Sequence, residues 1–195
     1  MGQSGDEGAI KLDALAANEV RVYTLDSGES SAVRDTARSI IGALLHVPAS
    51  RIELFATAKG KPLLRNDSAL HFSISHSRDV SMIALTRVAP VGVDIEKIRA
   101  VPNAEAILRR FFGENEIAEV LSDDRRDFRF IEAWTRAEAR VKVRGASMWE
   151  AATPDASTTV RQLIAPDGFV AAIAVAANSW HATQHDLSIT RCVAR

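Results

Sequence analysis

The chain has 195 residues, of which 47% are hydrophobic and 25% are charged, and its formal net charge at pH 7 is −1. This balance is typical of globular proteins and excludes bulk electrostatic attraction to nucleic acid or to an anionic membrane surface. The only cysteine, Cys192, excludes an intrachain disulfide and a cysteine-based metal site. The start lacks a secretory signal and no apolar run reaches membrane-spanning length, so we expect a cytoplasmic protein.

Turn residues and apolar periodicity predict strands and helices in regular succession after a flexible N-terminal segment, residues 1–17. In the first half we expect a strand at 20–25, a helix from Ser30 or Ser31 to about residue 45, a strand at 51–57, and paired strands at 72–75 and 81–88. In the second half we expect a strand at 91–96, helices near 103–112, 114–121 and 127–143, a hairpin of 160–164 with 169–177, and a last strand at 186–192.

The two halves, residues 18–89 and 90–195, share an order of elements: a strand, then helix, then three strands. We therefore predict an α+β fold made of two similar α/β halves related by pseudo-twofold symmetry. No sequence repeat is visible, so this prediction rests on the order of elements. A cleft between such halves is a common place for a ligand site, and two fused halves make a monomer sufficient.

Residues 91–96, with the sequence VGVDIE, carry the clearest chemical signal. Alternate side chains of a strand point to opposite faces. Asp94 and Glu96 therefore lie on one face, and the apolar residues that alternate with them lie on the other. Two adjacent carboxylates repel unless a cation or a proton lies between them, and Mg²⁺ takes such ligands together with substrate phosphates. The segment indicates a candidate Mg²⁺–phosphate site; an acidic strand face exposed to water is the alternative.

The helix predicted around residues 130–143 carries the second signal. Its apolar stripe consists of Phe130, Trp134, Ala137 and Val141. Glu138 and Lys142 are four residues apart and lie together on the flank of that stripe, at the border between core and solvent. This pair either faces a cleft or serves as an ordinary stabilising helix pair.

Two further clusters precede these. Residues 72–77, FSISHS, place His76 at a strand end between serines, where an imidazole either donates to a phosphate or satisfies a turn. Residues 60–62, GKP, form a rigid turn that displays Lys61, with a plain loop as the alternative.

The ordered set of clusters, spanning about residues 60–145, resembles the 4′-phosphopantetheinyl transferases, specifically their larger, pseudo-dimeric type that includes the surfactin-synthetase activating enzyme. The order is GKP at 60–62, FSISHS at 72–77, VGVDIE at 91–96, RFF at 110–112 with Glu116, and WTRAEA at 134–139 with Lys142. The resemblance implies an enzyme that binds coenzyme A with Mg²⁺. It would transfer the phosphopantetheine arm to a serine of an acyl or peptidyl carrier protein and release adenosine 3′,5′-bisphosphate.

The resemblance also implies roles for individual residues. Asp94, Glu96 and Glu138 would hold the metal, which joins the strand carboxylates to that of the helix. Lys142, one turn beyond Glu138, would contact the diphosphate and stabilise the leaving group.

The remaining implied roles concern the nucleotide and the carrier serine. His76 would bind a phosphate, with Ser75 close to the nucleotide. Lys61 and Pro62 would line the adenine side. Glu116 would be the base that activates the carrier serine, directly or through water.

The chain departs from the family's pattern in two places. Ala137 precedes Glu138 where the family has lysine, and the adjacent Arg136 points about 100° away around a helix. The first half is also short of the basic residues that hold the 3′-phosphate of coenzyme A in the family; Arg34 and Arg38 are the candidates to compensate.

Two other functions fit the same residues. A non-catalytic homologue would bind coenzyme A or a carrier protein without transfer, and would give tight carrier binding with no gain in carrier mass. An unrelated Mg²⁺-dependent phosphohydrolase would use the same carboxylates and release phosphate from nucleotides without any carrier protein.

Overall fold

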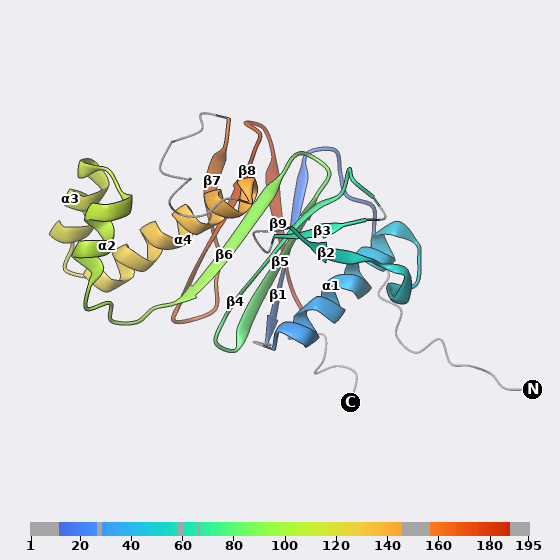
Figure 1. The fold of residues 1–195 in the computed structure, drawn as a ribbon, viewed down its shortest axis with the longest axis horizontal. Helices are drawn as coiled ribbons and strands as arrows, with labels where there is room; N and C mark the ends of the chain where they lie inside the picture. Colours follow the sequence, from blue (N-terminus) through green and yellow to red (C-terminus); the bar gives the residue numbers. More distant parts are fainter. Residues whose placement is uncertain (1–11, 27–28, 58–60, 66, 146–156, 188–195) are drawn as a thin grey trace, which may run out of the picture.

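The computed structural model describes residues 12–26, 29–57, 61–65, 67–145 and 157–187. The elements follow one another along the chain as shown in Figure 1. They are β1 (Glu19–Asp26), α1 (Ser30–Leu45), the 3₁₀ turn η1 (Ala49–Arg51), β2 (Leu54–Ala56), β3 (Pro62–Leu64), β4 (His71–Ser77), β5 (Val80–Thr86), β6 (Val91–Lys97), α2 (Ala104–Phe111), α3 (Glu114–Ser122), α4 (Arg126–Arg144), β7 (Thr159–Leu163), β8 (Phe169–Val175) and β9 (His181–Asp186). In these described ranges, no helix combines the length and apolar character needed to cross a bilayer.

Two larger sheets and one short ribbon organise the described strands. One sheet has the order β4-β5-β1-β9, in which β4, β5 and β1 are antiparallel neighbours and β9 runs parallel to β1. The other has the order β6-β8-β7 and is antiparallel throughout. The strands β2 and β3 form a separate antiparallel ribbon. In each half, therefore, the first strand pairs with the second strand of a later hairpin: β1 pairs with β5 of the β4–β5 hairpin, and β6 pairs with β8 of the β7–β8 hairpin.

The helices α1 and α4 cover the outer faces of the two sheets, whose inner faces pack on each other (Figure 1). The buried core between the sheets includes Val20, Val22, Val80, Met82, Val91, Val93, Ile95 and Ile173. On the outer face of the β6 sheet, Ala139 of α4 meets Ala172 and Ala174 of β8. Because side chains alternate along a strand, the odd-numbered residues of β6 enter the core, while Asp94 and Glu96 face the side of α4.

Gly92 allows α4 to lie directly on β6. A Cβ atom at this position would overlap the carbonyl oxygen of Ala139 and lie 2.8 Å from the backbone nitrogen of Val143. The glycine thus serves the close approach of two backbones rather than a turn. Because Gly92 has no side chain, the acidic face of β6 can lie next to the last turns of α4.

The predicted α+β class is confirmed, and most of the predicted elements are present with ends shifted by a few residues. The strand expected at 51–57 is shorter, because the chain first makes the 3₁₀ turn η1 after Pro48 and β2 begins only at Leu54. Of the segment expected to be flexible, residues 1–11 lie outside the described residues, whereas Leu12 and Leu15 pack against the core beside α1.

The C-terminal strand differs most from expectation. It begins at His181 rather than at residue 186, and residues 188–195, which include Cys192, lie outside the described residues. It pairs with β1, where His181 is the partner of Glu19, so the end of the second half completes the sheet of the first half. This pairing depends on contacts between the two ends of the chain, which local periodicity does not encode.

Candidate active site

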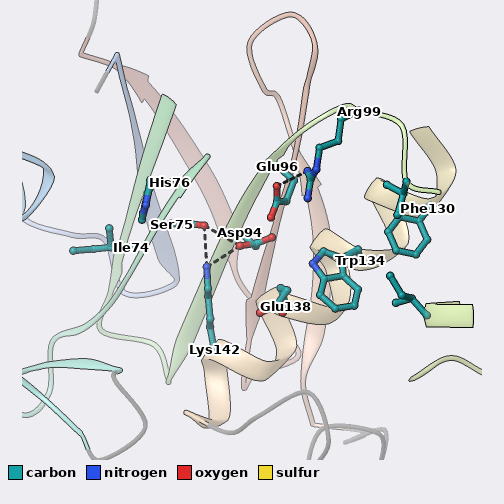
Figure 2. Close-up of a pocket in the computed structure, with 12 residues that line it drawn as sticks. Ile74, Ser75, His76, Asp94, Glu96, Arg99, Phe130, Trp134, Glu138 and Lys142 are labelled. Atoms are coloured by element: carbon teal, nitrogen blue, oxygen red, sulfur yellow. Dashed lines mark hydrogen bonds and ion pairs between the residues drawn. The ribbon is translucent and has the colours of Figure 1, made fainter. Parts of the chain in front are cut away.

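A cavity of about 590 Å³ opens beside β4, β6 and α4 (Figure 2). Its volume lies within the usual range of small-molecule sites in proteins. Its lining includes six of the side chains singled out from the sequence, namely Ser75, His76, Asp94, Glu96, Glu138 and Lys142. The tertiary structure therefore brings together residues from two strands of different sheets and one helix.

Asp94 lies deepest among the acidic residues and is 4% exposed. Its Oδ1 accepts hydrogen bonds from Ser75 Oγ at 2.8 Å and from Lys142 Nζ at 2.7 Å. Burial raises the pKa of Asp94 and the Glu96 carboxylate adds to that rise, while Lys142 and Ser75 oppose it. The lysine therefore supplies the positive charge that a buried carboxylate requires.

Glu138 and Lys142 lie one helical turn apart on α4, and both line the cavity (Figure 2). Lys142 Nζ donates a second hydrogen bond to Ser75 Oγ at 2.8 Å, so the ammonium is held by groups from β4 and β6. Burial raises the pKa of Glu138, and the nearby charges of Asp94 and Glu96 raise it further, against the influence of Lys142. The cavity thus concentrates carboxylates in a place where a cation is favoured.

Two features of these residues suit a hard divalent cation: their donor atoms are carboxylate oxygens, and one of these oxygens lacks a hydrogen-bond partner in the part of the chain that the structure describes. Asp94 Oδ2 is buried and, within the described chain, has no hydrogen-bond partner. Among the described residues no three potential ligands are already gathered as a ready-formed metal site. Mg²⁺ typically uses only one or two carboxylates together with waters and substrate phosphates, so a preformed protein cage is not required.

His76 connects this cavity to a neighbouring one of about 380 Å³, because it lines both. The second cavity lies between α1 and the β2–β3 ribbon. Arg34 and Arg38 line it from α1, and Phe55 and Pro62 line it from the ribbon. Two guanidinium groups and an imidazole therefore surround a hollow next to the carboxylates, which suits an anionic ligand with an apolar part.

Lys61, expected beside the nucleotide, contacts the end of α4. Its ammonium donates to the carbonyl oxygen of Val143 at 2.7 Å. The last carbonyls of a helix lack partners within the helix and attract cations, which explains this contact. Burial lowers the pKa of Lys61. Among the described residues that line the two cavities, Pro62 is present and Lys61 is not, so a nucleotide role for Lys61 stays a prediction.

Glu116 lies on α3 and is not among the side chains that line the cavity. Its Oε1 is 3.6 Å from Nη2 of Arg136, whose Nη1 is 3.7 Å from Glu132. The arginine next to the missing family lysine is thus engaged with α3 rather than with Glu138. The role of Glu116 as a base stays a prediction.

Sequence reasoning gave no role in the site to two of the residues that line the cavity. Arg99 lines the cavity and donates from Nη1 to Glu96 Oε2 at 2.9 Å. Its place three residues after Glu96 is the only signal that the sequence offers. Trp134, predicted within an apolar stripe, forms a cavity wall and stacks on Phe130 with ring centroids 6.1 Å apart. Both lie where β6 and α4 approach the α2–α3 region.

Comparison with known proteins identifies the family. The sequence profile described as the 4′-phosphopantetheinyl transferase superfamily matches residues 90–190, which contain the three carboxylates and Lys142. The chain belongs to this superfamily.

Curated proteins similar to this chain carry the same family name. The 4′-phosphopantetheinyl transferase HetI from Nostoc sp. is 31% identical over 169 residues, which cover 77% of this chain and 71% of HetI. The transferase psf-1 from Bacillus pumilus is 31% identical over 138 residues, covering 70% of this chain and 58% of psf-1. AcpT from Escherichia coli K12 is 34% identical over 116 residues, with 58% of this chain and 60% of AcpT covered. The chain thus spans less than two thirds of psf-1 and of AcpT.

Proposed function

We propose that this 4′-phosphopantetheinyl transferase superfamily member moves the phosphopantetheine arm of coenzyme A to a serine of an acyl or peptidyl carrier protein, with Mg²⁺. The serine oxygen forms a bond to the phosphorus that bears the pantetheine arm and gives up its proton to a base. The bond from that phosphorus to the bridging diphosphate oxygen breaks, and adenosine 3′,5′-bisphosphate leaves. The observation that carries the proposal is the position of Lys142, whose ammonium bridges Ser75 and Asp94 one turn from Glu138.

Transfer between two anionic partners depends on neutralising and positioning charge. Asp94, Glu96 and Glu138 would hold Mg²⁺, which when bound neutralises charge on the diphosphate. Lys142 offers an ammonium whose direction is already fixed by two hydrogen bonds. A diphosphate in this cavity would meet that ammonium without further reorganisation, and the same charge would stabilise the leaving group.

The second cavity is our proposed location for the nucleotide end of coenzyme A. Arg34 and Arg38 would hold the 3′-phosphate in place of the basic residues that the family has elsewhere, because both line this cavity. His76 lines both cavities and would contact a phosphate between them, close to Ser75. Pro62 would lie beside the adenine.

We also propose Glu116 as the base for the carrier serine, acting directly or through water. Its side chain is 33% exposed, and its ion pair with Arg136 links α3 to the helix that carries Glu138 and Lys142. The partial exposure of Glu116 supports this role, because the base must reach the serine of a bound carrier protein.

The two halves are proposed to be related by a pseudo-twofold axis. The first half pairs β1 with β5 and β5 with β4, and the second pairs β6 with β8 and β8 with β7, with a helix covering each sheet. The same connectivity in both halves supports the relation. We also propose a cytoplasmic monomer that acts on coenzyme A and a carrier protein. The net charge of −1 supports only one part of this proposal, that neither nucleic acid nor a membrane is a partner.

Intact-mass spectrometry of an apo carrier protein tests the proposal. Incubation with coenzyme A, Mg²⁺ and the protein should add one phosphopantetheine group to the carrier, and EDTA should prevent the gain. A panel of fatty-acid, polyketide and peptide carriers covers the substrate classes. Failure with every carrier, while coenzyme A still binds, would contradict transfer and favour the non-catalytic homologue.

A further inference from the structure

The strands β4 and β6 lie side by side although they belong to different sheets. Serine hydroxyls of β4 make the contact by accepting hydrogen bonds from backbone N–H groups of β6: Ser73 from Val93 at 3.1 Å, Ser75 from Ile95 at 3.4 Å, and Ser77 from Lys97 at 3.0 Å. The serines recur at every second position, so all three project from one face of β4. We call these three residues the serine row.

The pairing of β6 with β8 explains why these N–H groups need partners. Ile98 N donates to Gly168 O and Ala176 N donates to Pro90 O, which places the even-numbered residues of β6 in the hydrogen-bonded pairs with β8. The odd-numbered N–H groups therefore point to the other edge of β6, an edge strand of its sheet. The serine row satisfies this edge with side chains rather than with another strand.

Each hydroxyl also has a proton to donate, and two members of the row give it to a carboxylate. Ser75 Oγ donates to Asp94 Oδ1 at 2.8 Å, and Ser77 Oγ donates to Glu96 Oε2 at 3.1 Å. Ser73 makes the same contact with the N–H group of Val93, but the residue before Val93 is Gly92, which offers no carboxylate. The first half of the chain thus orients acidic side chains that belong to the second half.

We propose that Ser77 is a positioning residue that sets the affinity of the site for a divalent cation by fixing the Glu96 carboxylate. Ser77 and Arg99 both donate to Oε2 of Glu96, at 3.1 and 2.9 Å, so that these two contacts leave Oε1 for the cation. Groups that hydrogen-bond a metal-ligating carboxylate fix its orientation and affect metal affinity. The inference rests on the proposed function, because it takes Glu96 as a ligand.

Binding of Mn²⁺, followed by electron paramagnetic resonance in the presence of coenzyme A, tests this role with the full chain. Ser77→Ala should weaken Mn²⁺ binding about tenfold, whereas Ser73→Ala should leave it within about twofold of the wild type. Both variants lose the same kind of N–H acceptor, so Ser73→Ala is the matched control for damage to the strand contact. Ser77→Thr keeps a hydroxyl and should restore most of the affinity.

The transfer reaction supplies a second readout. In Ser77→Ala the Mg²⁺ concentration for half-maximal rate should rise about tenfold, while kcat at saturating Mg²⁺ stays near that of the wild type. Equal Mn²⁺ affinities in wild type and Ser77→Ala, or equal losses in Ser77→Ala and Ser73→Ala, would overturn the inference and leave the proposed function standing. Absence of Mn²⁺ binding in the wild type would overturn both the metal assignment and the inference.

Discussion

Lys142 Nζ lies 2.7 Å from Asp94 Oδ1 although 48 residues separate the two in the sequence. Lys142 comes from the last turn of α4, and Asp94 from the face of β6 on which α4 lies. The contact exists because Gly92 lets the helix backbone approach the strand. It places a cation and a buried carboxylate side by side in the lining of the cavity.

Replacement of Lys142 by alanine should lower kcat for transfer about 10²- to 10³-fold, the usual loss when one donor that stabilises developing charge is removed. The KM for the carrier protein should change much less, because the ammonium lies inside the cavity. Steady-state kinetics with varied carrier separates the two parameters. Arg126→Ala, an exposed change of equal charge at the far end of α4, is the control. An unchanged kcat in Lys142→Ala would remove the assigned role.

Asp94→Ala and Glu138→Ala should each abolish Mg²⁺-dependent transfer while the fold survives. Each removes a carboxylate from a cavity where negative charge is concentrated, and Asp94→Ala also removes the partner of Lys142. Carrier mass measures transfer, and far-ultraviolet circular dichroism measures folding. Glu119→Ala, an exposed change on α3, should keep full activity. Full activity in either cavity variant would contradict the proposed metal site.

Gly92→Ala should lower the free energy of unfolding by about 2 kcal/mol or more, because the new methyl group collides with the backbone of α4. Urea unfolding measures the change. Gly113→Ala is the control: nothing lies within 4 Å of a Cβ there, so the loss should stay below about 1 kcal/mol. Equal losses at the two glycines would show that the contact between α4 and β6 relaxes readily.

Arg34→Ala should raise the KM for coenzyme A more than the KM for 3′-dephospho-coenzyme A, since only the former carries the phosphate assigned to the second cavity. Arg38→Ala should behave in the same way, and the two KM values should converge in the double variant. Arg51→Ala changes an exposed arginine outside the cavity lining and serves as the control. Equal increases with both substrates would place the 3′-phosphate elsewhere.

Glu19 should make stability depend on pH. The residue is 5% exposed, and its carboxylate is 2.8 Å from Arg21 Nε and accepts a hydrogen bond from Thr183 of β9 at 2.6 Å. Burial is the largest single influence and would raise the pKa of Glu19, but the hydrogen bonds from Arg21, Thr183 and Ala16 together lower it from 4.5 to about 2.

Because the pKa of Glu19 is lower in the folded state, its contribution is complete above the unfolded value of 4.5 and is lost as the pH falls towards 2. A shift of this size corresponds to about 3 kcal/mol. Urea unfolding should find Glu19→Gln less stable than the wild type at pH 6, with the difference shrinking below pH 4.5. Glu53→Gln, a change in an exposed ion pair, should show no such convergence. A difference that stays constant with pH would contradict the assignment.

The local sequence pattern was sufficient to predict the strand and the helix that carry the carboxylates and the lysine of the site. Alternation along residues 91–96 correctly predicts that Asp94 and Glu96 leave the core on one face, and the four-residue spacing of Glu138 and Lys142 correctly predicts that both face one side of α4. These predictions succeed because strand and helix periods depend on the backbone of a single segment. The order of the motifs also predicted the family, which the superfamily match confirms.

Contacts between distant segments were decided by the tertiary structure. Lys61 donates to the end of α4, Glu116 pairs with Arg136, and β9 joins β1, none of which a periodic pattern predicts. The sequence by itself determined which side chains leave each strand or helix on the same face. Only the packing of α4 on β6 and of β4 against the edge of β6 decided which of these faces meet, because that packing depends on backbone approach and on hydrogen bonds between residues far apart in the chain.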